Sequence, residues 1–127
     1  MIHLDTHVVV WLYLRLNTKL SAAARREIRQ ADDIRISPMV MIELEDLISI
    51  GRIRVPSPEA VLGYLDEALN GVTLSRTSFA DVAHHARTIG WTRDPFDRLI
   101  VANAVVDQAR LVTADARINE HFRKAVW

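Results

Sequence analysis

The sequence predicts an α/β protein, a three-layer α/β/α sandwich with a four- to five-stranded parallel sheet. Short apolar runs typical of buried strands recur along the chain, and stretches with helical periodicity separate them. Strands joined through helical crossovers of a dozen or more residues pair in parallel, with helices covering the sheet. A length of 127 residues limits the chain to one domain, residues 1–127.

The expected strands and helices alternate along the chain. The apolar runs lie at 2–4, 34–36, 72–74 and 110–113, and AVW at 125–127 is a candidate for a fifth strand. Helical periodicity extends over roughly 6–15, 21–31, 38–50, 58–69, 78–89, 95–108 and 115–123. Three helices have explicit start signals, a capping residue followed by a proline suited to the first helical position: Ser37-Pro38, Ser57-Pro58 and Asp94-Pro95.

The composition excludes several kinds of site. There is no cysteine, so a disulfide framework and a thiolate metal site are both excluded. Sixteen basic and sixteen acidic residues balance, which argues against binding of nucleic acid through a large positive field. The apolar start of the chain is interrupted by Asp5 and lacks a basic front region. We therefore expect neither a secretory signal nor a membrane span, and a cytoplasmic protein.

Four acidic residues fall where one edge of such a sheet would gather them. Asp5 directly follows the first strand, and Asp115 follows the fourth after one small residue. Asp97 lies in the first turn of a later helix, and Glu43 lies one and a half turns into the helix after the second strand, near its apolar stripe. Ligands of parallel α/β sheets bind at the carboxyl ends of the strands. We therefore expect the four side chains to share one crevice.

Each acid also has an ordinary structural explanation. Asp5 and Asp94 are suited to cap helices, and Asp115 is suited to a turn; the cap alone accounts for Asp94. Four carboxylates in one crevice would repel one another by about 4 kcal/mol per pair at ~4 Å and an effective dielectric near 20. An oxygen-only set suits Mg²⁺ or Mn²⁺, which bridge phosphate oxygens and activate water. The pattern therefore predicts phosphodiester hydrolysis.

These residues resemble the PIN domains and, among them, the VapC-type ribonuclease toxins of bacterial toxin-antitoxin pairs. The resemblance extends over almost the whole chain and is most specific in DPFDRLIVANA at 94–104 and LVTADARI at 111–118. The opening strand that ends in Asp5-Thr6, LSAAARREI at 20–28 and SPMVMIEL at 37–44 agree with it. One departure is Ile118, where the family commonly has an aromatic residue.

The resemblance implies an active site and partners. Asp5, Glu43, Asp97 and Asp115 would be the catalytic residues and would hold Mg²⁺ or Mn²⁺. The substrate would be RNA, cut to leave a 5′-phosphate and a 3′-hydroxyl. The protein would form a homodimer and would be neutralised by a small antitoxin protein whose basic or apolar tail occludes the acidic pocket.

The resemblance also implies supporting residues. Thr6, Thr113 and Asn103 would support the metal ligands with hydrogen bonds, and Asp94 and Arg98 would lie at a rim that contacts substrate or partner. Trp91, close to the acid-bearing loop, is our candidate for a contact with RNA. Trp11, Tyr13 and Tyr64 could also stack on bases, but we interpret these aromatic residues, scattered at helical spacing, as core or dimer contacts.

The histidines give a weaker signal than the acids. We interpret His3 as a hydrogen-bonded structural residue, and His7 lies in the turn after the first strand. His84 and His85 point about 100° apart on a helix, which is unsuited to chelation, so we expect a half-exposed face there.

The sequence leaves a second function open, a non-catalytic PIN-fold interaction module that binds a basic peptide or RNA through its acidic cleft. It does not reveal the RNA sequence that is cut, the number of ions or the antitoxin.

Overall fold

The computed structural model describes residues 1–127 and contains the predicted alternation of strands and helices. The strands are β1 (Ile2–Leu4), β2 (Ile34–Ile36), β3 (Val72–Leu74), β4 (Arg110–Val112) and β5 (Ala125–Val126). The helices are α1 (Thr6–Tyr13), α2 (Ala22–Gln30), α3 (Pro38–Ser49), α4 (Pro58–Ala68), α5 (Phe79–Ala86), α6 (Pro95–Val106) and α7 (Ala116–His121), with a short 3₁₀ turn η1 (Asn17–Lys19). None of the helices is long and apolar enough to cross a membrane.

The five strands form one parallel sheet in the order β3-β2-β1-β4-β5. The central strand β1 pairs with β2 on one side and with β4 on the other, so that Ile2 lies opposite both Ile34 and Arg110. The strand order reverses between β1 and β4, and ligands of parallel sheets bind outside the strand ends at such a switch point. The fifth strand, for which AVW was the candidate, is present.

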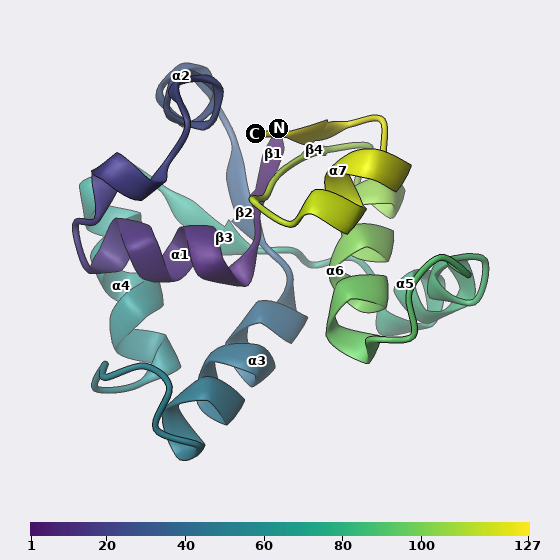
Figure 1. The fold of residues 1–127 in the computed structure, drawn as a ribbon, viewed down its shortest axis with the longest axis horizontal. Helices are drawn as coiled ribbons and strands as arrows, with labels where there is room; N and C mark the ends of the chain where they lie inside the picture. The colour runs from purple at the N-terminus through teal and green to yellow at the C-terminus, as the bar shows by residue number, and fades with distance from the viewer.

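Helices cover both faces of the sheet, as the predicted three-layer sandwich requires. Helices α1, α3 and α4 contact one another, and α5 packs against α6. In Figure 1, α1 and α4 lie on one side of the strands, whereas α5 and α6 lie on the other. The core between these layers is apolar, and its largest fully buried side chains include Leu4, Ile36, Leu44, Ile100 and Leu111. Each of these contributes about 1.5 to 3 kcal/mol by leaving water.

The helix starts agree with the sequence signals, whereas the helices end one to three residues earlier than their periodicity predicts. Ser37, Ser57 and Asp94 each accept a hydrogen bond from a backbone amide in the first turn of the helix that follows. Shortly after α1, α4 and α6 the backbone enters the left-handed region, with positive φ at Arg15, Asn70 and Gln108. A residue in this conformation cannot continue a right-handed helix, so the chain turns there toward its next element.

Candidate active site

Asp5 lies at the carboxyl end of the central strand β1 and is 6% exposed. Its Oδ1 accepts a hydrogen bond from the Thr6 amide at 2.8 Å, so Asp5 caps α1 as its position after a strand predicted. Its Oδ2 accepts a second hydrogen bond from the Thr113 hydroxyl at 2.5 Å. Burial raises the pKa of Asp5, and these two hydrogen bonds act in the opposite direction. The carboxyl group is therefore fixed in place from both β1 and β4.

Asp115 lies just beyond β4 and caps α7. Its Oδ1 accepts a hydrogen bond from the Ile118 amide at 2.9 Å, and its own amide donates to the Thr113 hydroxyl oxygen at 3.1 Å. Thr113 thus bonds to both acids, donating to Asp5 and accepting from Asp115. The Asn119 side chain holds the same turn by donating to the carbonyls of Thr113 and Asp115 at 2.8 and 2.9 Å. The sequence did not identify Asn119, whose position in a short helix gave no signal.

Asp97 lies half-buried in the first turn of α6, and no hydrogen bond holds its side chain. Its pKa is raised to about 7, first by burial and then by repulsion from the carboxylates of Asp94, Asp115, Asp5 and Glu43. Those acids come from three other parts of the chain besides the start of α6. The structure therefore brings all four predicted site acids into one electrostatic neighbourhood.

Glu43 is the half-buried acid on α3, and no hydrogen bond of ordinary geometry holds its carboxyl group, which lies close to the Thr6 hydroxyl. Burial raises its pKa; proximity to Thr6 and His7 acts against this, while Asp5 and Asp94 reinforce it. The Thr6 hydroxyl is fully buried and has no hydrogen-bond partner. An unpaired buried hydroxyl beside two carboxylates is the kind of group that a bound ion or its water would satisfy.

The four acids form no ion pair with lysine or arginine: the ion pairs of the molecule all involve other acids. The oxygen-only donor set and the unpaired Thr6 hydroxyl fit a hard divalent cation. As the side chains stand, however, no group of three acids or histidines is close enough together to hold one ion. Glu43 and Asp97 are the two acids whose carboxyl groups no hydrogen bond of ordinary geometry fixes, whereas Asp5 and Asp115 are held by their caps and by Thr113.

The predicted rim residues lie in different surroundings. Asp94 caps α6, accepting from the Asp97 amide at 3.1 Å, as predicted. The prediction that Arg98 lies at the rim is not supported by its contacts: its Nε and Nη2 donate to the carbonyl of Ala86 at 3.3 and 3.1 Å. Because Ala86 ends α5, this fork joins α6 to α5 instead of facing the acids. Trp91 is half-buried and stacks on His121, with ring centroids 5.0 Å apart.

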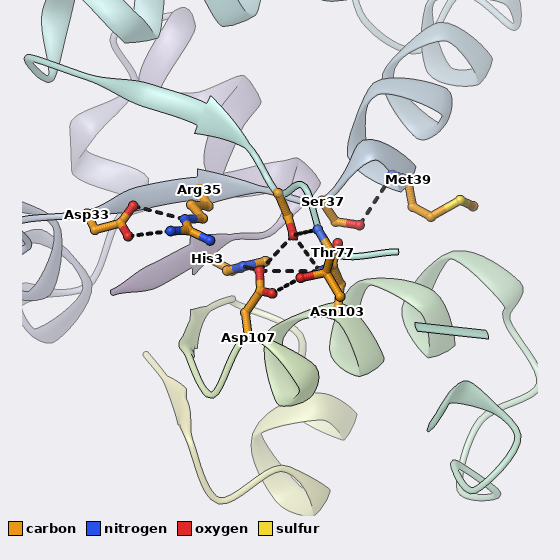
Figure 2. Close-up of polar contacts among 9 residues, drawn as sticks. His3, Asp33, Arg35, Ser37, Met39, Thr77, Asn103 and Asp107 are labelled. Carbon is orange, nitrogen blue, oxygen red and sulfur yellow. Dashed lines mark hydrogen bonds and ion pairs between the residues drawn. The ribbon is translucent and has the colours of Figure 1, made fainter. Parts of the chain in front are cut away.

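Asn103 belongs to a second polar cluster, which the sequence reasoning missed. Its Nδ2 donates to the Ser75 hydroxyl at 2.9 Å and approaches Asp107 at 3.4 Å, so it bonds to none of the four acids and its assignment as their support is corrected. Asp107 also accepts hydrogen bonds from His3 at 2.8 Å, from Ser75 at 2.7 Å and from Thr77. Figure 2 shows His3, Thr77, Asn103 and Asp107 converging from β1, the loop after β3 and α6.

The second cluster fixes the end of α6 to the sheet. The His3 side chain is fully buried, and its role as a hydrogen-bonded structural histidine is confirmed. Burial lowers the pKa of His3, although the hydrogen bond that His3 donates to Asp107 opposes this. For Asp107, burial alone would raise the pKa, but hydrogen bonds from Thr77, Ser75 and His3 outweigh it and the pKa is lowered. Asp107 is therefore ionised and His3 neutral at pH 7.

Comparisons with known proteins agree with this fold. Residues 2–124 match the model of the PIN domain family. The chain is 34% identical over 119 residues to Ribonuclease VapC22 of Mycobacterium tuberculosis, covering 93% of this chain and 89% of that protein. The crystal structure of VapBC2 from Rickettsia felis, bound to a DNA fragment from their promoter, aligns with a TM-score of 0.62 at 21% identity, covering 94% and 92% of the two chains. The protein belongs to the PIN domain family.

Proposed function

We propose that this PIN domain is a metal-dependent endoribonuclease, the toxin of a toxin-antitoxin pair. The similarity to Ribonuclease VapC22 over nearly the whole chain supports the ribonuclease class. The observation that carries the proposal is the group of four carboxylates that lack cationic partners; burial, and then repulsion from the neighbouring carboxylates, raises the pKa of Asp97 among them to about 7. In this proposal the partners are RNA as substrate, a small antitoxin protein and a second copy of the chain in a homodimer.

Asp5, Glu43, Asp97 and Asp115 would hold the cation, and each has a distinct part. Asp5 and Asp115 are fixed by caps and by Thr113, so they set the position of the site at the ends of β1 and β4. Glu43 and Asp97 approach it from α3 and α6 and complete it by rotation of their side chains. A bound Mg²⁺ or Mn²⁺ would activate water and stabilise charge on the phosphate oxygens.

A conservative substitution in the site tests the enzymatic proposal. We expect Glu43→Gln to abolish cleavage of single-stranded RNA in Mn²⁺, because the amide removes one anionic ligand while keeping the size of the side chain. Glu45→Gln is the matched control, since Glu45 is exposed on the same helix. Cleavage by the Glu43→Gln protein at the rate of the Glu45→Gln protein would contradict the assignment of the site.

Growth of a bacterial host tests the toxin proposal separately. Expression of the chain should arrest growth, and Asp5→Ala should relieve the arrest. Cleavage of RNA in vitro without growth arrest would leave a ribonuclease that is not a toxin.

A second candidate is the non-catalytic interaction module that binds a basic peptide or RNA through the acidic cleft. The observation that favours it is that no three acids stand close enough to hold an ion. The two functions differ in their response to metal, because a ligand that binds only the folded state raises its stability. The enzyme should gain melting temperature in Mn²⁺ and lose the gain in EDTA, whereas the interaction module should show neither effect.

A further inference from the structure

A row of aromatic rings extends from the acid cluster along α1 to the residue after β5. The rings of His7 and Trp11 have centroids 6.0 Å apart, and those of Trp11 and Trp127 are 5.8 Å apart. His7 is exposed, Trp11 is half-buried against the core, and Trp127 is 36% exposed. His7 lies in the first turn of α1, the helix that Asp5 caps. The row therefore begins at the proposed site of cleavage.

The same surface carries exposed cations. The exposed Lys19 ammonium lies over the Trp11 ring, 5.7 Å from its centroid. Helix α2 contacts β5, and in Figure 1 it lies close to the C-terminal end of the chain. Its arginines are all exposed: Arg25, Arg26 and Arg29. None of these three forms an ion pair with an acid.

Aromatic rings beside exposed cations are the combination that binds single-stranded nucleic acid. Bases stack on the rings in a way that tolerates any sequence, and the cations neutralise the backbone phosphates. A basic peptide would be attracted by the four acids but repelled by Lys19 and the arginines of α2. An RNA strand needs the reverse, cations along its path and a metal at the point of cleavage. The charge pattern therefore favours RNA as the occupant of the row.

We propose that His7, Trp11 and Trp127, flanked by Lys19 and the arginines of α2, form a binding track for single-stranded RNA that leads into the acid cluster. The inference rests on the proposed ribonuclease function and gives it a substrate path. The track binds unpaired bases of any sequence, because stacking on aromatic rings depends little on the identity of the base. Paired RNA keeps its bases stacked on one another and is excluded from it.

The test measures binding and cleavage separately. Binding of a fluorescein-labelled single-stranded oligouridylate is followed by anisotropy in EDTA, so that it does not depend on the metal. We expect Trp127→Leu and Trp11→Leu each to weaken binding by about 5- to 100-fold, the loss that one base-aromatic stack gives. Lys19→Gln should reduce the slope of log affinity against log salt by about 0.7. Phe79→Leu is the matched control, since Phe79 is a 67% exposed aromatic on α5, on the other side of the sheet.

Two results would overturn the track. In the first, Trp127→Leu and Trp11→Leu melt as the wild type does and bind the oligouridylate as tightly as it does. In the second, the wild type does not bind the oligouridylate and the substitutions change sedimentation of the protein instead, so that the row is a contact between copies of the chain. Failure of the proposed function is distinguishable from both: the row would then govern binding as expected, while the wild type in Mn²⁺ cleaves no RNA.

Discussion

Thr113 donates a 2.5 Å hydrogen bond to Oδ2 of Asp5, although 108 positions separate the two residues in the sequence. They meet because β1 and β4 are neighbours in the sheet, with Leu4 opposite Val112. The same hydroxyl oxygen accepts a hydrogen bond from the Asp115 amide at 3.1 Å. One side chain thus fixes the relative positions of two of the four predicted ligands.

Loss of this hydroxyl should impair both folding and cleavage. Thr113→Val keeps the shape of the side chain but removes one of the two hydrogen-bond donors of the buried Asp5 carboxylate, which costs about 1 to 3 kcal/mol. We expect a loss of that size in the free energy of unfolding by urea denaturation at pH 7, together with loss of cleavage. Thr113→Ser retains the hydroxyl and should retain most of both. Equal losses in the two variants would show that the methyl group, and not the hydrogen bond, is important.

Substitution of Asp97 should change how stability depends on pH. In EDTA the folded protein holds the Asp97 proton up to about pH 7, whereas an aspartate in the unfolded chain releases it near pH 4. Between these values the folded state binds more protons, so the contribution of Asp97 to stability decreases as the pH rises. Asp97→Asn should remove this decline and be more stable than the wild type at pH 8 by roughly 1 to 2 kcal/mol, after allowance for solvent screening of a half-buried group.

The control for Asp97 is Asp94→Asn, which keeps a good helix cap and removes one of the nearby charges. The stability of Asp94→Asn should still decrease as the pH rises, but by less than that of the wild type. If the melting temperature of the wild type changes between pH 4 and 8 just as that of Asp97→Asn does, the raised pKa of Asp97 is contradicted.

His3 should make stability increase as the pH rises, which is the opposite of the effect of Asp97. Because its pKa is lowered in the folded state, the unfolded chain takes up the proton first as the pH falls below about 6.5, and stability decreases. His3→Gln cannot titrate, yet its amide can still donate to Asp107. We expect this variant to lose the decrease below about pH 6.5, when measured in an Asp97→Asn background that removes the opposing trend. His84→Gln, at an exposed position on α5, should leave the decrease unchanged.

Metal binding should depend on pH through the same carboxylates. An ion competes with protons for its ligands, and Asp97 holds its proton up to about pH 7. We expect Mn²⁺ to raise the melting temperature strongly at pH 8 and weakly at pH 5.5, and EDTA to reverse the effect at both. Asp97→Asn should show little gain at either pH. A gain in the wild type that is as large at pH 5.5 as at pH 8 would contradict a site built on Asp97.

The sequence predicted the layers of the fold and the acids of the site because these depend on local signals. Apolar runs, capping residues before prolines and acids placed after strands are all visible within a few positions. The ends of α1 and α6 were placed too late because Arg15 and Gln108 take positive φ values, which neither residue type signals. The partners of Asn103 and Arg98 were not predictable in this way. They are the Ser75 hydroxyl and the Ala86 carbonyl, which packing brings close from other elements.

The second polar cluster was not predictable for a related reason. His3, Ser75, Thr77 and Asp107 come from distant parts of the chain, and each alone is an ordinary polar residue. Their association follows from packing of the end of α6 over β1 and the loop after β3, which periodicity does not describe. A buried histidine in an apolar strand gave the one usable signal, a need for a hydrogen-bond partner.

The strand order has a consequence for synthesis of the chain on the ribosome. The central strand β1 is made first, but its neighbour β4 begins at Arg110, so the middle of the sheet stays open until most of the polypeptide has emerged. Asp5 and Asp115 cannot meet before then. A nascent chain therefore carries no assembled acid cluster, and the four carboxylates come together only when the last segment has been released and has folded.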